Sequence, residues 1–257
     1  MRLPARVELF ATCVADLAAP GPAAAAVEIL EAVDVEVVVP RAQSCCGQPA
    51  LSSGFPREAA KVACAWLDAF EDADAVVTVS GSCAAMIHHH LPRLLDGADA
   101  ERAASLAQRT WELSQFLVDH DLVPPLRLEA RVAYHDACHM LRSLGERDAP
   151  RALLARIDGL ELRELADPEI CCGFGGTFAT RFPEVSVAMA DDKLDQTEQA
   201  DVDWLVSADA GCLLHVRTRA AATGRAARTR HIAQLVHDAL QVRERTPDHT
   251  ATSRWNR

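Results

Sequence analysis

Eight of the nine cysteines in this chain fall into two similar sets, and cysteine thiolates bind metals. Each set has a single cysteine, then a Cys-Cys-Gly triplet, then a last cysteine, in the patterns C-x31-CC-x36-C and C-x32-CC-x39-C. Four thiolates can hold a tetrahedral zinc ion or a [4Fe–4S] cluster. The first cysteine set is Cys13, Cys45, Cys46 and Cys83, and the second cysteine set is Cys138, Cys171, Cys172 and Cys212.

The spacing within each set favours iron–sulfur over zinc. Structural zinc sites usually present two short C-x2–4-C segments, and neither set contains one. Ligands far apart in sequence, with one adjacent pair, fit a site that a folded sheet assembles. We therefore expect one or two iron–sulfur clusters per chain, with a structural zinc scaffold as the alternative.

Each cysteine pair is followed by a glycine, Gly47 or Gly173. In an extended strand, neighbouring side chains point to opposite faces, so the two thiols of a pair converge only where the backbone turns sharply. Glycine adopts the positive φ of such a turn at little cost. We expect both glycines to lie in ligand loops whose backbone amides approach the cluster sulfurs.

Two histidines flank Cys138 in the motif YHDACH at 134–139. His135 and His139 could each bind a metal or move a proton, because neutral imidazole suits iron and zinc. We favour the alternative in which they surround the cluster and donate hydrogen bonds to a sulfur or to the backbone. Asp136 could orient either histidine or cap a helix.

Other residues of these types have simpler interpretations. Cys64 lies on the apolar face of a helical segment, which favours a small buried hydrophobic side chain over a ligand. Consecutive histidines cannot all face one site on a helix, so those at 88–90 are expected to face mainly solvent.

The elements that must position the cysteines also occur twice. In each half we expect three strands, the first and third of which end at a cysteine, with helices between them. The expected strands cover residues 6–13, 35–40 and 74–83, and then 131–138, 160–165 and 202–212. The expected helices cover residues 22–33 and 56–70, and then 147–157 and 183–200.

Strands that alternate with helices form parallel α/β units, in which ligands bind beyond the carboxyl ends of the strands. The eight paired cysteines fall at or just after expected strand ends. The sequence therefore predicts an α/β fold of two pseudo-symmetric repeats of parallel strand–helix units, with cysteines at the strand C-terminal ends.

The domain boundaries follow from the repeat. Helical periodicity at 104–120 and an extended stretch at 123–130 predict a connection between the halves, and 229–242 has the pattern of an amphipathic helix. The predicted regions are a first repeat at 1–103, a helix and linker at 104–130, a second repeat at 131–242 and a loose tail at 243–257.

Composition narrows the class of protein. The formal net charge of −11 argues against nucleic-acid binding, which needs a basic face. We find no apolar run of membrane-spanning length and no secretory signal at the N-terminus. Nine cysteines without such a signal predict a reducing compartment, and hence a cytoplasmic protein.

Several motifs together resemble the cysteine-rich CCG-domain family. The family includes the cysteine-rich subunit of heterodisulfide reductase, the glycolate oxidase iron–sulfur subunit and the lactate-utilisation protein A type. The resemblance is greatest to the last type, because no ferredoxin-like cysteine segment precedes the first Cys-Cys-Gly. The matching motifs are the two CCG triplets, YHDACH at 134–139, CCGFGGTFA at 171–179, SGSC at 80–83 and DAGCLLH at 209–215.

The resemblance implies an iron–sulfur subunit of an oxidoreductase complex that oxidises L-lactate, a 2-hydroxy acid, to pyruvate. Each cysteine set would bind a cluster, and the chain would pass electrons to partner iron–sulfur subunits. No catalytic acid or base is assigned.

One departure from the family concerns Ser80 and Asp209. Some CCG proteins carry a fifth cysteine at these positions, three residues before the last cysteine of each set, whereas this chain has a hydroxyl and a carboxylate. The departure argues against the alternative of thiol or disulfide chemistry at a cluster, as in heterodisulfide reduction. A hydroxyl or carboxylate ligand stays open.

Overall fold

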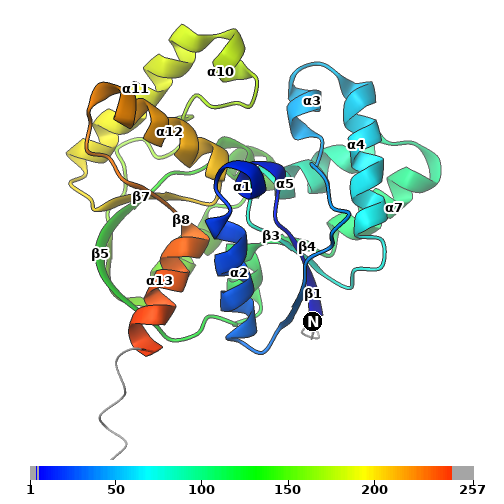
Figure 1. Ribbon diagram of the computed structural model, residues 1–257, viewed down its shortest axis with the longest axis horizontal. Coiled ribbons are helices and arrows are strands. Elements are labelled where there is room, and N and C mark those ends of the chain that lie inside the picture. Colours follow the sequence, from blue (N-terminus) through cyan, green and yellow to red (C-terminus); the bar gives the residue numbers. More distant parts are fainter. Residues whose placement is uncertain (1–3, 5, 245–257) are drawn as a thin grey trace, which may run out of the picture.

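Two parallel four-stranded sheets form the framework of the protein, which a computed structural model describes at residue 4 and residues 6–244 (Figure 1). The strand orders β2-β1-β3-β4 and β6-β5-β7-β8 repeat one topology. The first sheet contains β1 (Arg6–Phe10), β2 (Glu36–Val38), β3 (Val76–Thr78) and β4 (Thr110–Glu112). The second contains β5 (Leu126–Tyr134), β6 (Ile157–Leu162), β7 (Trp204–Ser207) and β8 (Thr229–His231). The expected α/β class with two similar parallel units is confirmed.

Helices connect the strands in both units. The first half has α1 (Cys13–Ala18), α2 (Gly21–Glu31), α3 (Gln48–Ser52), α4 (Pro56–Ala69), α5 (Gly81–Ala85), the π-helix η1 (Met86–His90), α6 (Leu91–Leu94), α7 (Gly97–Ala107) and α8 (Leu113–Asp119). The second half has the π-helix η2 (Met140–Leu144), α9 (Asp148–Leu154), α10 (Phe178–Arg181), α11 (Pro183–Gln199), α12 (Ala210–Thr223) and α13 (Ile232–Glu244). None of the helices in the described ranges is both long and apolar enough to cross a membrane.

Each sheet has a fourth strand that was not expected. The helix expected at 104–120 is interrupted by β4, which separates α7 from α8. The helix expected at 229–242 begins only after β8, and β5 begins inside the extended stretch at 123–130. The strands β4 and β8 have three residues each and pair with β3 and β7. Such pairing is a long-range contact that helical periodicity does not reveal. Most of the tail expected at 243–257 lies outside the described residues.

Aromatic packing fixes α4 on the first sheet. The side chains of Ala59, Ala63 and Trp66 lie on one face of α4 and are buried. The ring of Phe10, at the end of β1, meets Trp66 edge to face with centroids 5.8 Å apart and Phe70 at 5.6 Å. Edge-to-face pairs of this kind add about 0.5–1.5 kcal/mol to the burial of the rings. The packing sets the position of α4 beside the first Cys-Cys-Gly loop.

The two halves pack through reciprocal contacts. Helix α1 of the first half touches α12 of the second, and the equivalent η2 touches α5. In the same way α8 packs on α9. Their counterparts α13 and α2 also pack on each other and lie side by side in Figure 1. In each case a helix of one half contacts a helix of the other, and the two equivalent helices contact each other as well. Reciprocal contacts of this kind are typical of a two-fold axis. The halves are therefore related as the subunits of a symmetric dimer, and one apolar core runs through both.

Candidate metal centre

All eight paired cysteines line one cavity at the carboxyl ends of the strands. Cys13 opens α1 after β1, and Cys83 lies in α5 after β3. The second half repeats this arrangement, with Cys138 after β5 and Cys212 in α12 after β7. The cysteine pairs lie in the loops after β2 and β6. All nine cysteines of the chain are free thiols, and Cys64 is not among the cavity residues.

In the first cysteine set the sulfurs lie in contact in two pairs. The thiol of Cys13 donates to Sγ of Cys45 at 3.4 Å, and that of Cys46 donates to Sγ of Cys83 at 3.5 Å. The N–H of Gly47 also donates to Sγ of Cys45, at 3.4 Å. The turn thus brings both thiols of the pair to the same site, as the glycine predicted.

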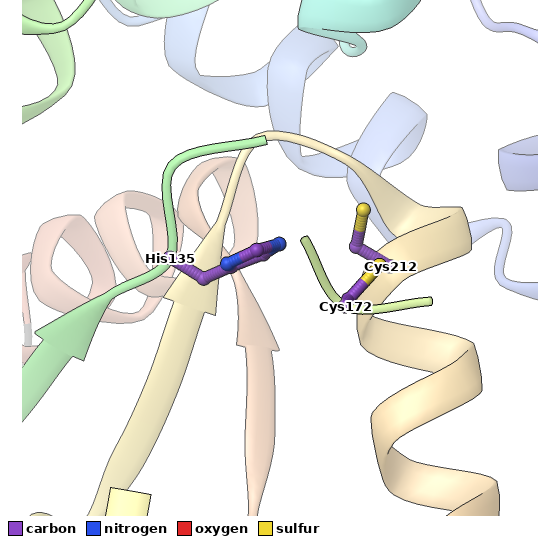
Figure 2. Close-up of side chains that lie close together, drawn as sticks. All are labelled: His135, Cys172 and Cys212. Carbon is purple, nitrogen blue, oxygen red and sulfur yellow. The ribbon is translucent and has the colours of Figure 1, made fainter. Parts of the chain in front are cut away.

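The second cysteine set repeats this loop geometry. The N–H of Gly173 donates to Sγ of Cys171 at 3.4 Å, and that of Phe174 donates to Sγ of Cys172 at 3.5 Å. A ring nitrogen of His135 and the sulfurs of Cys172 and Cys212 all lie within 4.8 Å of one another (Figure 2). Backbone amides aimed at sulfur stabilise negative charge there, as they do around metal-bound thiolates.

Within each cysteine pair the two thiols differ in acidity. Hydrogen bonds from neighbouring thiols and the glycine N–H lower the pKa of Cys45 and of Cys171. The pKa of Cys46 and of Cys172 is raised, because each of them donates to neighbouring sulfurs and is buried. The first member of each pair is therefore the more thiolate-like, and the order is the same in both halves.

Gly47 and Gly173 are required by their surroundings as well as by their backbone conformation. Their φ angles are +91° and +87°. A Cβ on Gly47 would lie 3.0 Å from the carbonyl oxygen of Ala59 in α4, and one on Gly173 would lie 2.4 Å from that of Ser186 in α11. The first loop therefore rests directly on the backbone of α4, and the second on that of α11.

Ser80 and Asp209 meet each other across the boundary between the halves. The hydroxyl of Ser80 donates to Oδ1 of Asp209 at 2.6 Å, and the N–H of Ser82 donates to the same carboxylate. Ser80 Oγ also accepts from the N–H of Cys83 at 3.1 Å. Burial raises the pKa of Asp209 to about 6. These residues bind one another, and the bond ties the last cysteine of the first set to the second half.

The two histidines beside Cys138 have different environments. His135 is 1 % exposed, and neither ring nitrogen forms a well-aligned hydrogen bond with a described residue, although the backbone of Pro168 lies close enough for a weak polar contact. Burial and the nearby Lys193 lower its pKa to about 3, so the ring is neutral. His139 is half-buried and its Nδ1 lies 3.7 Å from Sγ of Cys138. Asp136 orients neither ring, because Arg151 binds both of its oxygens at 2.8 Å.

The expectation that the histidines at 88–90 face solvent is wrong. All three are half-buried, and Nε2 of His88 lies 2.8 Å from the carbonyl oxygen of Thr110. The π-helix η1 turns this side chain toward the strand β4, which the sequence analysis did not include.

The sequence analysis missed two buried ionisable residues at the ends of the fourth strands. Glu112 ends β4 and accepts from the N–H and the hydroxyl of Ser114. His231 ends β8, and its Nδ1 accepts from the N–H of Ala233 at 3.2 Å. A sequence signal was present. TWEL at 110–113 and TRHI at 229–232 each have a threonine first, an ionisable residue third and an aliphatic residue last.

Replacing Glu112 by glutamine is expected to change how stability depends on pH. Burial raises the pKa of this carboxyl from 4.5 to about 7, so between these values the folded chain keeps a proton that the unfolded chain has lost. This contribution to stability is complete below pH 4.5 and is lost as the pH rises to 7, by about 3 kcal/mol. Relative to wild type, Glu112→Gln should therefore gain about that much between pH 5 and pH 8. Unfolding midpoints in urea at both pH values test this, and parallel changes in the two proteins would contradict it.

Comparison with known proteins places these features in a family. A family model described as a cysteine-rich domain, CCG, matches residues 7–88 and 132–217, one match in each half. "Lactate utilization protein A" of Geobacillus kaustophilus is 44% identical over 239 residues, covering 90% of this chain and 98% of the relative. The protein of that name from Halalkalibacterium halodurans is 41% identical over 242 residues, covering 93% and 99%.

A solved structure shares the fold. A hypothetical protein from Helicobacter pylori superposes with a TM-score of 0.62 at 10% identity, over 93% of this chain. The match spans 49% of that longer chain. At this identity the likeness concerns the fold alone.

Proposed function

Because this chain belongs to the cysteine-rich CCG family, we propose that it is an iron–sulfur electron-transfer subunit of a system that oxidises L-lactate, a 2-hydroxy acid, to pyruvate. The observation that carries the proposal is the pair of cysteine sets, eight free thiols around one cavity. The relatives named lactate utilization protein A are matched over nearly their full length, which supports the substrate.

The donor groups at the cavity fit an iron–sulfur centre. Each set offers four thiols, and backbone N–H groups point at the sulfurs of Cys45, Cys171 and Cys172. A bound cluster would supply one-electron storage and release. The residues that would hold it are Cys13, Cys45, Cys46 and Cys83 in one half and Cys138, Cys171, Cys172 and Cys212 in the other.

The chain itself would hold and tune these centres. Burial of Cys46, Cys83, Cys172 and Cys212 keeps water from part of each donor set. The backbone N–H groups of Gly47, Gly173 and Phe174 offset the negative charge of the thiolates to which they donate. Since no acid or base is assigned to substrate oxidation, we place that chemistry on partner proteins, and the partners for electrons are other iron–sulfur subunits of the system.

Metal analysis of protein purified without oxygen tests the proposal. We expect iron and acid-labile sulfide in equal amounts, with about eight irons per chain if each set holds a [4Fe–4S] cluster and about four if one set is filled. EPR spectra of the reduced protein should show the corresponding signals. Zinc without sulfide would contradict electron transfer and leave a structural scaffold.

A further inference from the structure

The first half shows that the fold does not need a histidine at the position of His135. In the aligned segments RVELFATC (6–13) and RVAYHDAC (131–138), Phe10 takes the place of His135. Both side chains are buried, at 0% and 1% exposure. Phe10 packs on Trp66 and Phe70, so an apolar ring satisfies this position. The imidazole in the second half therefore calls for an explanation other than packing.

A buried imidazole without a partner is costly. Leaving a buried polar group unsatisfied costs about 1–3 kcal/mol. His231, which is buried to the same degree, has a partner at each ring nitrogen, the N–H of Ala233 and the carbonyl oxygen of Val79. His135 has no such bond at either nitrogen among the residues that the structure describes, and its contact with the Pro168 backbone is weaker. A group that binds its nitrogen would remove this cost.

One ring nitrogen of His135 faces two sulfurs. This nitrogen lies within 4.8 Å of Sγ of both Cys172 and Cys212, and these two sulfurs lie within the same distance of each other (Figure 2). Three donor atoms that close together can share one metal ion. A neutral imidazole and two thiols form a donor set that suits iron and zinc.

A second substitution also distinguishes the halves. In the helices that open with Pro56 and Pro183, Trp66 occupies the same position as Lys193. The Lys193 side chain is buried, and its Nζ donates to the carbonyl oxygens of Asp167 and Pro168, just before the second cysteine pair. In the described part of the chain this ammonium forms no salt bridge, and its positive charge acts on Cys171 and Cys172 as well as on nearby carboxylates.

We propose that His135 is a metal ligand of the second centre, together with Cys172 and Cys212. The inference rests on the proposed function and deepens it, because the two centres then differ in composition. The donors of the first centre are all thiolates, whereas those of the second include a neutral nitrogen beside a buried cation. Histidine ligation raises the reduction potential of a cluster, and a nearby positive charge stabilises the added electron. Both the imidazole and the buried cation therefore favour the reduced state of the second centre. Electrons therefore pass from the first centre to the second.

The test is pulsed EPR on the reduced full-length protein, purified without oxygen and labelled with 15N-histidine. We expect a strong nitrogen hyperfine coupling of a directly bound imidazole in the wild type. Its absence from the wild type would overturn the proposal without any variant. The coupling should vanish in His135→Phe, which installs the residue of the first half, and persist in His139→Phe.

Potentiometry and metal analysis complete the experiment. In His135→Phe the midpoint potential of one centre should fall while that of the other stays unchanged. Unchanged potentials with an unchanged coupling, or loss of the coupling only in His139→Phe, would overturn the proposal. If the protein holds zinc without sulfide, the proposed electron transfer fails, and zinc-edge X-ray absorption then decides the ligand role. Loss of one nitrogen donor from the zinc in His135→Phe would support the ligand role, and an unchanged set of zinc donors would overturn it.

Discussion

Replacing Cys46 by alanine is expected to remove about half of the iron from the chain and to leave the signal of the second centre unchanged. The reason is local. The thiol of Cys46 is buried, and its hydrogen bonds within the described part of the chain are to sulfurs of its own set, Cys83 at 3.5 Å and the neighbouring Cys45. Iron analysis and EPR of the reduced variant, purified without oxygen, measure the result.

Two further variants are controls for this prediction. Cys172→Ala makes the same change in the second half, and it should remove the other signal and the other half of the iron. Cys64→Ala should keep all of the iron, because this thiol lies outside the cavity and donates to Asp99 at 3.8 Å. Loss of all iron in Cys46→Ala or in Cys172→Ala would show instead that both sets share one cluster.

Replacing Gly173 by alanine is expected to destabilise the fold by about 3–4 kcal/mol, of which the positive φ accounts for about 1–2 kcal/mol. The rest arises because the new Cβ would lie 2.4 Å from the carbonyl oxygen of Ser186, and a helix backbone has little room to move. The loop that holds Cys171 and Cys172 would shift away from α11. The melting temperature, with iron content as a second readout, measures both effects.

The same loop supplies a matched control. Gly176 has a positive φ of +61°, but a Cβ there would meet nothing within 4 Å. Gly176→Ala should therefore cost only the backbone part, about 1–2 kcal/mol. Gly47→Ala, with the carbonyl oxygen of Ala59 at 3.0 Å, should fall between the two. Equal losses in all three variants would mean that contact with the helix contributes nothing.

The repeated cysteine spacing, together with expected strands that alternate with helices in both halves, was sufficient to predict the α/β class and the two similar units. Cysteine ligands, glycine turns and buried strands leave strong local patterns, and both halves carry them. The strands β4 and β8 could not be predicted in the same way, because three residues such as Thr110–Glu112 are too short for a periodicity of their own. Their pairing with β3 and β7 is a tertiary contact.

The gathering of the eight paired cysteines at one cavity was predictable, whereas the asymmetry between the halves was not. The sequence places Phe10 and His135 at equivalent positions, yet only the structure shows that one ring is satisfied by packing and that the other has no well-aligned hydrogen bond among the described residues. Ser80 and Asp209 were recognised as a departure from the family. That they bind each other depends on how the halves dock, which no local pattern encodes.

The contact between Ser80 and Asp209 also bears on how the halves recognise each other. Because the two residues are equivalent, their hydrogen bond lies close to the approximate two-fold axis. Two first halves from different chains, docked in the same way, would place serine against serine. Two second halves would bury one carboxylate against another, which is strongly unfavourable. The mixed pairing instead gives the buried carboxylate a hydroxyl donor, so pairing between second halves of different chains is disfavoured.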